Sequence, residues 1–269
     1  MSVLCDLLDV SRPAYYAWLT AVPTSREEKD LQLAPLIRRI FYRHKRRYGA
    51  RRIVSELRDL GHACSERRVS RLLKIQGLKA IQPKSFKPRT TDSRHTLGYS
   101  PNLLLEFEEP ESMNQLWVGD ITYISLAGKR FIYLAMLMDR YSRRMVGWKL
   151  SDDMTENLVI DALGSAIKKR QPPLGLIHHS DRGGQYAGKR YRRILQRAGM
   201  KQSMSRADNC YDNAFMESCF GTVKTELEMT EYENKRTALQ EIKAYVAYYN
   251  TQRKHSSLGY LTPAQFEGE

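Results

Sequence analysis

The sequence LWVGDITYI, residues 116–124, is an apolar, β-type run with one carboxylate, Asp120, in its middle. Two further runs of this kind follow at residues 129–138 and 144–150, and a polar turn joins them. A carboxylate that a strand carries into a buried sheet is costly unless it is paired or binds a metal ion. The stretch therefore predicts a sheet that contains a candidate functional residue.

The region that follows alternates helices and short strands. Apolar periodicity predicts, in order, a helix at 155–169, a strand at 176–179, a basic helix at 185–198, a strand at 201–204 and a helix from 212 to about 229. The order βββαβαβα is typical of an α/β fold with a mixed five-stranded sheet. The sequence before residue 100 predicts helices only, so an all-α domain precedes this fold.

The composition describes a globular chain whose 269 residues are enough for two domains. Hydrophobic residues make up 42% of it, and the mean hydropathy is −0.56. The longest apolar run, residues 131–138, is far shorter than the roughly 20 residues that cross a bilayer. The amino terminus has no basic secretory region, and the four cysteines form no CxxC pair. We therefore expect a cytoplasmic protein without disulfides or structural zinc.

The net charge of +14 is concentrated near the amino terminus. Residues 1–100 contain 21 Lys and Arg against 9 Asp and Glu, whereas the remaining chain is nearly neutral. A basic module attached to a neutral body favours a polyanionic partner, nucleic acid above all. The alternative is a charged surface that only keeps the chain soluble, but solubility does not require so uneven a distribution.

Three helices are expected between residues 30 and 80. Gly61 ends the second of them, and Ser65 caps a third that runs to about Gln76. Two helices joined by a short turn with glycine are typical of a helix-turn-helix, and the third helix carries a basic stripe of Arg67, Arg71 and Lys74. The alternative is a solvated amphipathic helix in an ordinary bundle.

Three acidic residues could meet in the α/β region. Asp120 lies in the first strand, Asp181 lies just beyond the fourth, and Glu217 lies on the last helix. Oxygen ligands without His or Cys select Mg²⁺, or Mn²⁺ as a substitute, over zinc. Two such ions can polarise water or a 3′-hydroxyl and stabilise the leaving oxygen in a displacement at phosphorus.

The last helix adds a second constraint. At about 100° per residue, one stripe of it contains Asn213, Glu217, Gly221 and Lys224. A carboxylate between an amide, a glycine that permits close approach and a lysine suits a metal ligand beside a phosphate backbone. The alternative is a surface Glu and Lys with an incidental Gly. Another acid, Asp139, could lie near the site but is expected to cap a turn. His178, His179 and His255 could shape the site or touch phosphate, and the alternative for them is ordinary packing or hydrogen bonding.

Several strings of the sequence resemble one known family. They are Trp117-Val-Gly-Asp-Ile-Thr-Tyr123, His179-Ser-Asp-Arg-Gly-Gly-Gln-Tyr186 and Asp212-Asn-Ala-Phe-Met-Glu-Ser218, with Arg47-Tyr-Gly-Ala-Arg-Arg52 before them and Tyr249-Asn-Thr-Gln-Arg-Lys-His-Ser-Ser-Leu-Gly-Tyr260 after them. Together they resemble the DDE transposases of the insertion-sequence "three" family, in particular its second-reading-frame (OrfB) protein, a relative of retroviral integrases. The resemblance covers about residues 30–266.

The resemblance implies an RNase H-like, integrase-type core in which Asp120, Asp181 and Glu217 hold two Mg²⁺ ions. It implies cleavage of DNA strands and strand transfer, in which a 3′-hydroxyl attacks another phosphodiester, at the ends of an insertion sequence, in the bacterial cytoplasm at the nucleoid. Double-stranded DNA would be contacted by Lys224 and by the basic residues Arg51, Arg52, Arg67, Arg71 and Lys74, with Asn213 and Gly221 in support. Further expected partners are copies of the chain on DNA and the first-frame (OrfA) protein, fused or separate.

The expected domains are a partial helical segment at 1–24, a helix-turn-helix domain at 30–80, a basic linker at 81–110, the catalytic core at 111–230 and a C-terminal helical extension at 231–269. Two other functions remain open. One is a DNA-binding regulator with a degenerate acidic core, and the other is a nuclease that hydrolyses DNA without joining it. The second-frame protein alone could also be an inhibitor, because sustained leucine heptads are absent from the sequence.

Overall fold

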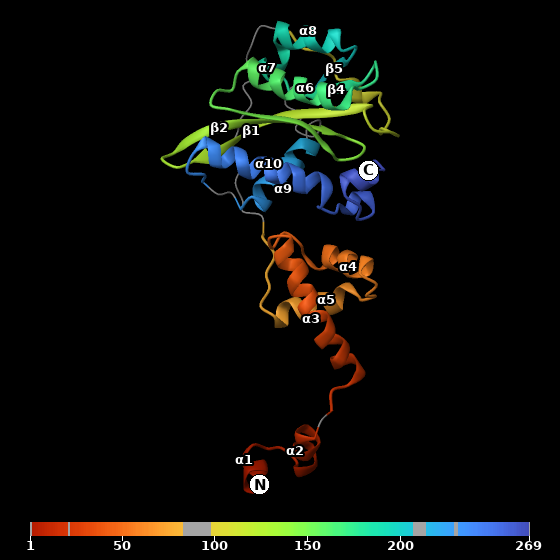
Figure 1. Cartoon of the computed structure of the whole chain (residues 1–269), viewed down its shortest axis with the longest axis vertical. Helices are drawn as coiled ribbons and strands as arrows, with labels where there is room; N and C mark the ends of the chain where they lie inside the picture. The colour runs from red at the N-terminus through yellow and green to blue at the C-terminus, as the bar shows by residue number, and fades with distance from the viewer. Residues whose placement is uncertain (1, 21, 83–97, 207–213, 229–230, 269) are drawn as a thin grey trace. The chain divides into compact units, whose positions relative to one another are not determined.

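The structure, a computed structural model, describes residues 2–20, 22–82, 98–206, 214–228 and 231–268. The chain divides into two compact units, Met1–Ala80 and Ile81–Glu269. Figure 1 shows the first unit as helices only and the second as a sheet with helices on both of its faces. None of the helices in the described part of the chain is long and apolar enough to cross a membrane.

The helices of the first unit begin and end where local sequence signals predict. They are α1 (Ser2–Leu7), α2 (Arg12–Leu19), α3 (Ser25–Arg43), α4 (Ala50–Asp59) and α5 (Glu66–Ile75). The Ser65 side chain accepts a hydrogen bond from the Arg68 amide at the start of α5, as its capping role requires. Gly61 and Gly77 follow α4 and α5 at φ +81° and +65°, which favour glycine. The third, fourth and fifth helices share one core, whose fully buried side chains include Ile37, Phe41, Tyr48, Ile53, Leu57 and Val69.

The second unit contains the predicted mixed sheet of five strands. These are β1 (Leu116–Leu126), β2 (Arg130–Asp139), β3 (Met145–Ser151), β4 (Ile177–Ser180) and β5 (Lys201–Met204), in the order β3-β2-β1-β4-β5. The three long strands pair antiparallel, whereas β4 is parallel to both β1 and β5. This α/β arrangement confirms the predicted fold class.

Helices cover both faces of the sheet (Figure 1). One face carries α6 (Glu156–Arg170), α7 (Gly184–Ala187) and α8 (Lys189–Arg197), which pack on alternate residues of β1 such as Trp117 and Ile121. The opposite face carries α9 (Ala214–Glu226) and α10 (Lys235–Thr251), which pack on the other residues of β1, including Val118 and Ile124. Each strand residue therefore belongs to one of two cores, as the period of two in a strand requires.

The prediction of a single basic helix at 185–198 is wrong, because the structure has two helices there, separated at Gly188. That residue has extended backbone (φ −60°, ψ 145°) between α7 and α8. The Tyr191 amide donates to Glu156 Oε1 over 2.9 Å, and a Cβ at Gly188 would lie 2.1 Å from the same oxygen. A side chain from α6 thus occupies the space at the break, which the helical period alone did not reveal.

Two segments outside the expected core form part of the second unit. Residues 98–110, in the range expected to be a linker, include the short 3-10 helix η1 (Leu103–Leu105), and the Leu103 amide donates to Ser203 Oγ of β5 over 2.9 Å. The helix α10 contributes Ile242, Tyr245 and Tyr249 to the core on its face of the sheet. The chain ends with the 3-10 helix η3 (Ser256–Leu258) and with α11 (Pro263–Phe266).

Candidate active site

Asp120 and Asp181 both follow the point where β1 and β4 pair. The parallel ladder ends with Val118 opposite His179, two residues before Asp120 on β1 and two residues before Asp181, which lies just past the end of β4. Asp120 shares its face of β1 with Val118 and Ile124, which pack toward α9 and α10. The charges of both aspartates act on the Tyr186 hydroxyl, so the two carboxylates lie in the same region. Carboxylate oxygens suit a hard divalent cation.

A backbone amide close to each aspartate in the sequence orients its carboxylate. Asp181 Oδ1 accepts a hydrogen bond of 2.9 Å from the Gly183 amide, and Asp120 Oδ1 accepts one of 2.7 Å from the Ile121 amide. A Cβ at Gly183 would lie 3.0 Å from Asp181 Oδ1 and 2.9 Å from Gln185 Oε1. The glycine therefore leaves room for the turn that presents the Asp181 carboxylate.

A buried polar layer lies on the opposite face of the sheet from the two aspartates. The imidazole of His178 is fully buried, and its Nε2 lies 3.0 Å from the Tyr191 hydroxyl. A Cβ at Gly119 would lie 3.0 Å from this Nε2, so the glycine before Asp120 makes room for the ring. Burial, and then the charge of Asp120 among others, raises the pKa of the neighbouring Tyr186 hydroxyl. Sequence reasoning missed these supports, although a glycine inside a strand is a signal of such close approach.

Lys224 of α9 lies beside Asp120. Its Nζ is 4.3 Å from the centroid of the Tyr123 ring on β1. Burial lowers the pKa of Lys224, and the charge of Asp120 opposes this effect. The pairing of β1 with β4 covers only residues 116–118, so the stretch of β1 with Asp120 and Tyr123 lies beyond that ladder. The lysine is therefore half-buried against β1 and close enough to Asp120 to be affected by its charge.

Glu217 is exposed on the first turns of α9, seven residues before Lys224 on the predicted stripe. Within the described residues, no group of three or more His, Cys, Asp or Glu is close enough to hold a metal ion, so the three predicted carboxylates do not form one ligand cluster in this structure. An added Cβ at Gly221 would meet no atom within 4 Å, so this side of the helix is open. Asn213, the fourth member of the stripe, lies outside the described residues.

The C-terminal end of α9 is fixed by a buried ion pair. Glu226 and Arg253 have side chains only 6% and 5% exposed, and Arg253 Nη2 donates to Glu226 Oε1 over 2.8 Å. Arg253 Nε also donates to both carboxylate oxygens, and the Tyr245 hydroxyl donates to Glu226 Oε2 over 3.0 Å. The carboxylate raises the pKa of Arg253 despite the opposing effect of burial. This network joins the helix with Glu217 and Lys224 to α10 and the segment after it.

The predicted DNA-contact residues of the first unit differ in their surroundings. Arg67 and Lys74 are exposed on α5. Arg71 forms an ion pair with Asp30 of α3, and the Arg51 guanidinium lies 3.1 Å from a Glu66 carboxylate oxygen. Arg52 lies partly buried with its guanidinium carbon 5.5 Å from the Tyr48 ring centroid. The basic stripe expected on α5 is thus present on the surface, and its member Arg71 forms an ion pair with α3.

The other polar residues singled out in the sequence have structural roles. Asp139 is fully buried and accepts hydrogen bonds from the Tyr141 and Ser142 amides, both over 3.0 Å, which confirms it as a turn cap. Burial raises its pKa. His179 Nδ1 lies 2.8 Å from Ser203 Oγ and joins β4 to β5.

Three sequence-family models match the chain. An "HTH-like domain" matches residues 27–86, and two models described as "Integrase core domain" match residues 110–210 and 198–263. The first match coincides with the unit of α3, α4 and α5. The other two span the sheet, both aspartates, α9 and α10.

Curated relatives match over almost the whole chain. The chain is 40% identical over 98% of its length to an uncharacterised 31 kDa protein of insertion element IS600 from Shigella sonnei, of which it covers 97%. It is 38% identical over 91% of its length to the transposase of IS904 from Lactococcus lactis, of which it covers 97%. It is 36% identical over 100% of its length to the InsF transposase of IS3A from Escherichia coli, of which it covers 94%.

Among solved structures, the chain is similar to the catalytic core domain of HTLV-2 integrase in complex with magnesium. The identity is 17% and the TM-score 0.41, over 58% of this chain and 97% of the other. It is also similar to a chain of the simian T-cell lymphotropic virus intasome in complex with a PP2A regulatory subunit, at 15% identity and TM-score 0.48, over 78% of this chain and 69% of the other. At these TM-scores the two likenesses add no argument about function.

Proposed function

Because the chain belongs to the IS3-type insertion-sequence transposases with an integrase core domain, we propose that it cleaves and joins DNA strands at the ends of an insertion sequence. The observation that supports this proposal is that Asp120 and Asp181 each follow by two residues the last paired residues of β1 and β4, Val118 and His179. That helix contributes a third carboxylate, Glu217, and a half-buried cation, Lys224, beside Asp120. Oxygen ligands and a cation in one place suit chemistry on a phosphodiester.

Asp120, Asp181 and Glu217 would hold two Mg²⁺ ions, with Mn²⁺ as a substitute. Such ions polarise the attacking oxygen and stabilise the leaving oxygen when bound. Asp120 and Asp181 are already oriented by their backbone hydrogen bonds. Glu217 is exposed at the start of its helix, so its carboxylate would complete the site only with the ions and DNA in place.

The reaction has two displacements at phosphorus. In the first, water attacks the phosphodiester at the element end, and the bond from phosphorus to the 3′-oxygen breaks to give a 3′-hydroxyl. In the second, this hydroxyl loses its proton and attacks another phosphodiester, whose own 3′-oxygen leaves and takes up a proton. Lys224 would hold the phosphate beside Asp120, because its ammonium group lies on the Tyr123 ring there.

The first unit would bind the duplex. Its exposed α5 residues Arg67 and Lys74 are suited to phosphate contacts, and Arg51, Arg52 and Arg71 would extend this basic surface. Copies of the chain would assemble on the two element ends, and a first-frame protein would complete their recognition.

A cleavage and joining assay tests the function. Labelled DNA with the element ends is incubated with Mg²⁺ or Mn²⁺ and with the wild type, Glu217→Gln or the control Glu241→Gln, an exposed carboxylate on α10. We expect joined products from the wild type and the control but not from Glu217→Gln. Nicking without joining, even with the first-frame protein added, would favour a nuclease. DNA binding without any metal-dependent chemistry under the same conditions would favour a regulator.

A further inference from the structure

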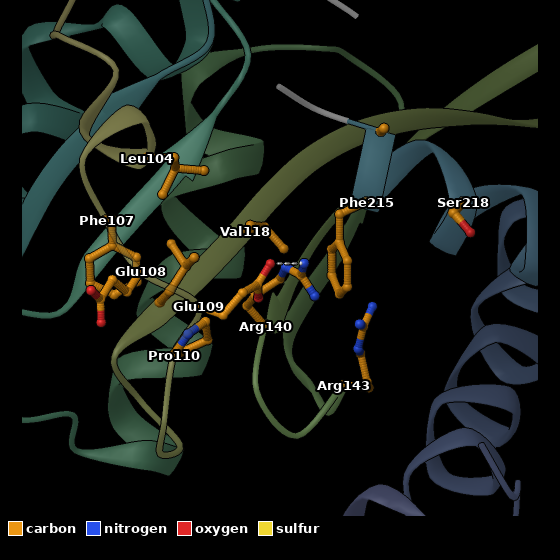
Figure 2. A pocket seen from close by; sticks show the side chains of 12 residues that line it. Leu104, Phe107, Glu108, Glu109, Pro110, Val118, Arg140, Arg143, Phe215 and Ser218 are labelled. Atoms are coloured by element: carbon orange, nitrogen blue, oxygen red, sulfur yellow. Dashed lines mark hydrogen bonds and ion pairs between the residues drawn. The ribbon is translucent and has the colours of Figure 1, made fainter. Parts of the chain in front are cut away.

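A pocket of about 500 Å³ is lined by residues of β1, of the segment between β2 and β3, and of α9 (Figure 2). Leu116 and Val118 of β1 form its floor. Val118 comes two residues before Asp120 and faces the same side of the sheet, which places the two side chains about 7 Å apart along the strand. The floor of the pocket is therefore within one nucleotide of the Asp120 carboxylate.

The walls of the pocket combine apolar and aromatic side chains with charged ones, including Glu108 and Glu109. Leu104, Phe107 and Pro110 line one side, and Phe215 of α9 lies across from them (Figure 2). Phe215 precedes Glu217 by two residues, and Ser218, which follows Glu217, also lines the pocket. One helix thus contributes to both the pocket and the proposed metal site.

Two arginines from the segment between β2 and β3 pack on the same ring. The guanidinium carbons of Arg140 and Arg143 lie 4.5 and 4.3 Å from the centroid of Phe215. Arg140 donates to Glu109 Oε1 over 2.7 Å, whereas Arg143 forms no ion pair with any residue that the structure describes. Burial and then the charge of Arg140 lower the pKa of Arg143. The charge of Glu109 opposes this effect in part, and a phosphate beside Arg143 would offset more of the repulsion between the two cations.

We propose that this pocket holds the nucleotide next to the scissile phosphate, with its base turned out of the duplex. The base would stack between the aromatic wall and the layer of Phe215 and arginines, and Arg143 would contact its phosphate. Unpaired bases stack on aromatic rings and on guanidinium planes, and an apolar floor replaces the neighbours that the base loses in the helix. The proposal rests on the proposed function, because it takes Asp120 and Asp181 as the place of the scissile phosphate.

Binding of single-stranded DNA tests the pocket without any reaction. The full-length chain is titrated, in EDTA, with a thymidine 12-mer and with an abasic 12-mer that has the same phosphates but no bases. We expect the wild type to bind the thymidine strand more tightly. The Phe215→Leu variant should bind that strand about 5- to 100-fold more weakly, as loss of one stacked base implies, and the abasic strand unchanged. Arg143→Gln should weaken the binding of both strands.

Two matched controls and one rescue variant complete this experiment. Phe266→Leu changes a half-buried ring that packs on Tyr141, and Arg197→Gln removes one exposed charge from α8 on the opposite face of the sheet. Neither should change the preference for bases. Phe215→Trp keeps an aromatic ring in the wall and should keep the preference.

Either of two results would overturn the pocket assignment. One is equal affinity of the wild type for the two strands. The other is that Phe215→Leu and Phe266→Leu have the same affinity for the thymidine strand relative to the abasic strand. Because no metal and no cleavage are involved, these results leave the joining assay untouched. Conversely, the wild type could bind the thymidine strand more tightly than the abasic strand, lose this preference in Phe215→Leu, and yet never join strands. That result would contradict the proposed function but not the pocket assignment.

Discussion

Removal of one partner of the Glu226–Arg253 pair should strongly destabilise the second unit. The Glu226→Gln variant keeps the shape of the side chain but leaves the Arg253 guanidinium buried without its carboxylate. Both side chains are about 5% exposed, so water cannot replace the lost partner. Such a change typically costs about 3–5 kcal/mol of unfolding free energy. For a unit of this size, that corresponds to a fall of roughly 6–20 °C in the melting temperature.

Urea unfolding and calorimetry measure the effect. The control is Asp161→Asn, which breaks an ion pair of 2.9 Å with Lys149 whose side chains are both 49% exposed. An exposed pair of this kind contributes at most about 1 kcal/mol. The double variant Glu226→Leu with Arg253→Met should recover much of the stability, because it removes both charges from the interior.

The reasoning would be refuted if Glu226→Gln lost no more stability than Asp161→Asn. It would also be refuted if the double variant lost more unfolding free energy than the single variants Glu226→Leu and Arg253→Met lose when their losses are added. A loss of stability together with a loss of strand joining would support the role of this pair in holding α9.

Three further outcomes follow from particular residues. Gly147→Ala should lower the unfolding free energy by about 1–3 kcal/mol or more, because its Cβ would lie 2.5 Å from a backbone oxygen of α6. Gly164→Ala has open space around its Cβ and should raise the unfolding free energy by roughly 0.5–1 kcal/mol. Urea unfolding measures both. Burial lowers the pKa of His178 to about 3, below the unfolded value of 6.5. The unfolding free energy should therefore fall by up to about 1.4 kcal/mol per pH unit as pH falls from 6.5 towards 3. The plot of unfolding free energy against pH should be flatter for His178→Asn. Arg67→Gln and Lys74→Gln should each weaken duplex binding and reduce the slope of log K against log salt by about 1, and an unchanged slope would exclude the residue from the interface.

Local signals in the sequence predicted the elements and the class of the fold. The alternation of apolar residues around Asp120 and the cap at Ser65 depend on neighbours within a few positions, so they could be interpreted without the structure. The break at Gly188 depends on Glu156, which is 32 positions away in the sequence, and no local pattern records it. The packing of α10 against the sheet likewise depends on contacts between distant parts of the chain.

The candidate site was predictable in part. The sequence pointed to Asp120 and Asp181, which follow by two residues the last paired residues of β1 and β4. It did not indicate that Glu217 is exposed and that the three carboxylates form no single ligand cluster among the described residues, because the position of a carboxylate at a helix end depends on tertiary contacts and ligands. The Arg140–Arg143–Phe215 cluster was also missed, since arginines in a turn have no periodicity to reveal their partner.

A change of metal preference tests the central claim that Asp120, Asp181 and Glu217 hold the divalent ions. Strand joining is measured for the wild type, Asp181→Cys and Asp181→Asn, each with Mg²⁺ and with Mn²⁺. A thiolate is a poor ligand for Mg²⁺ but a better one for Mn²⁺. We therefore predict that the cysteine variant is inactive with Mg²⁺ and regains activity with Mn²⁺, while the asparagine variant stays inactive with both. Full activity of the cysteine variant with Mg²⁺, or no recovery with Mn²⁺, would contradict the claim.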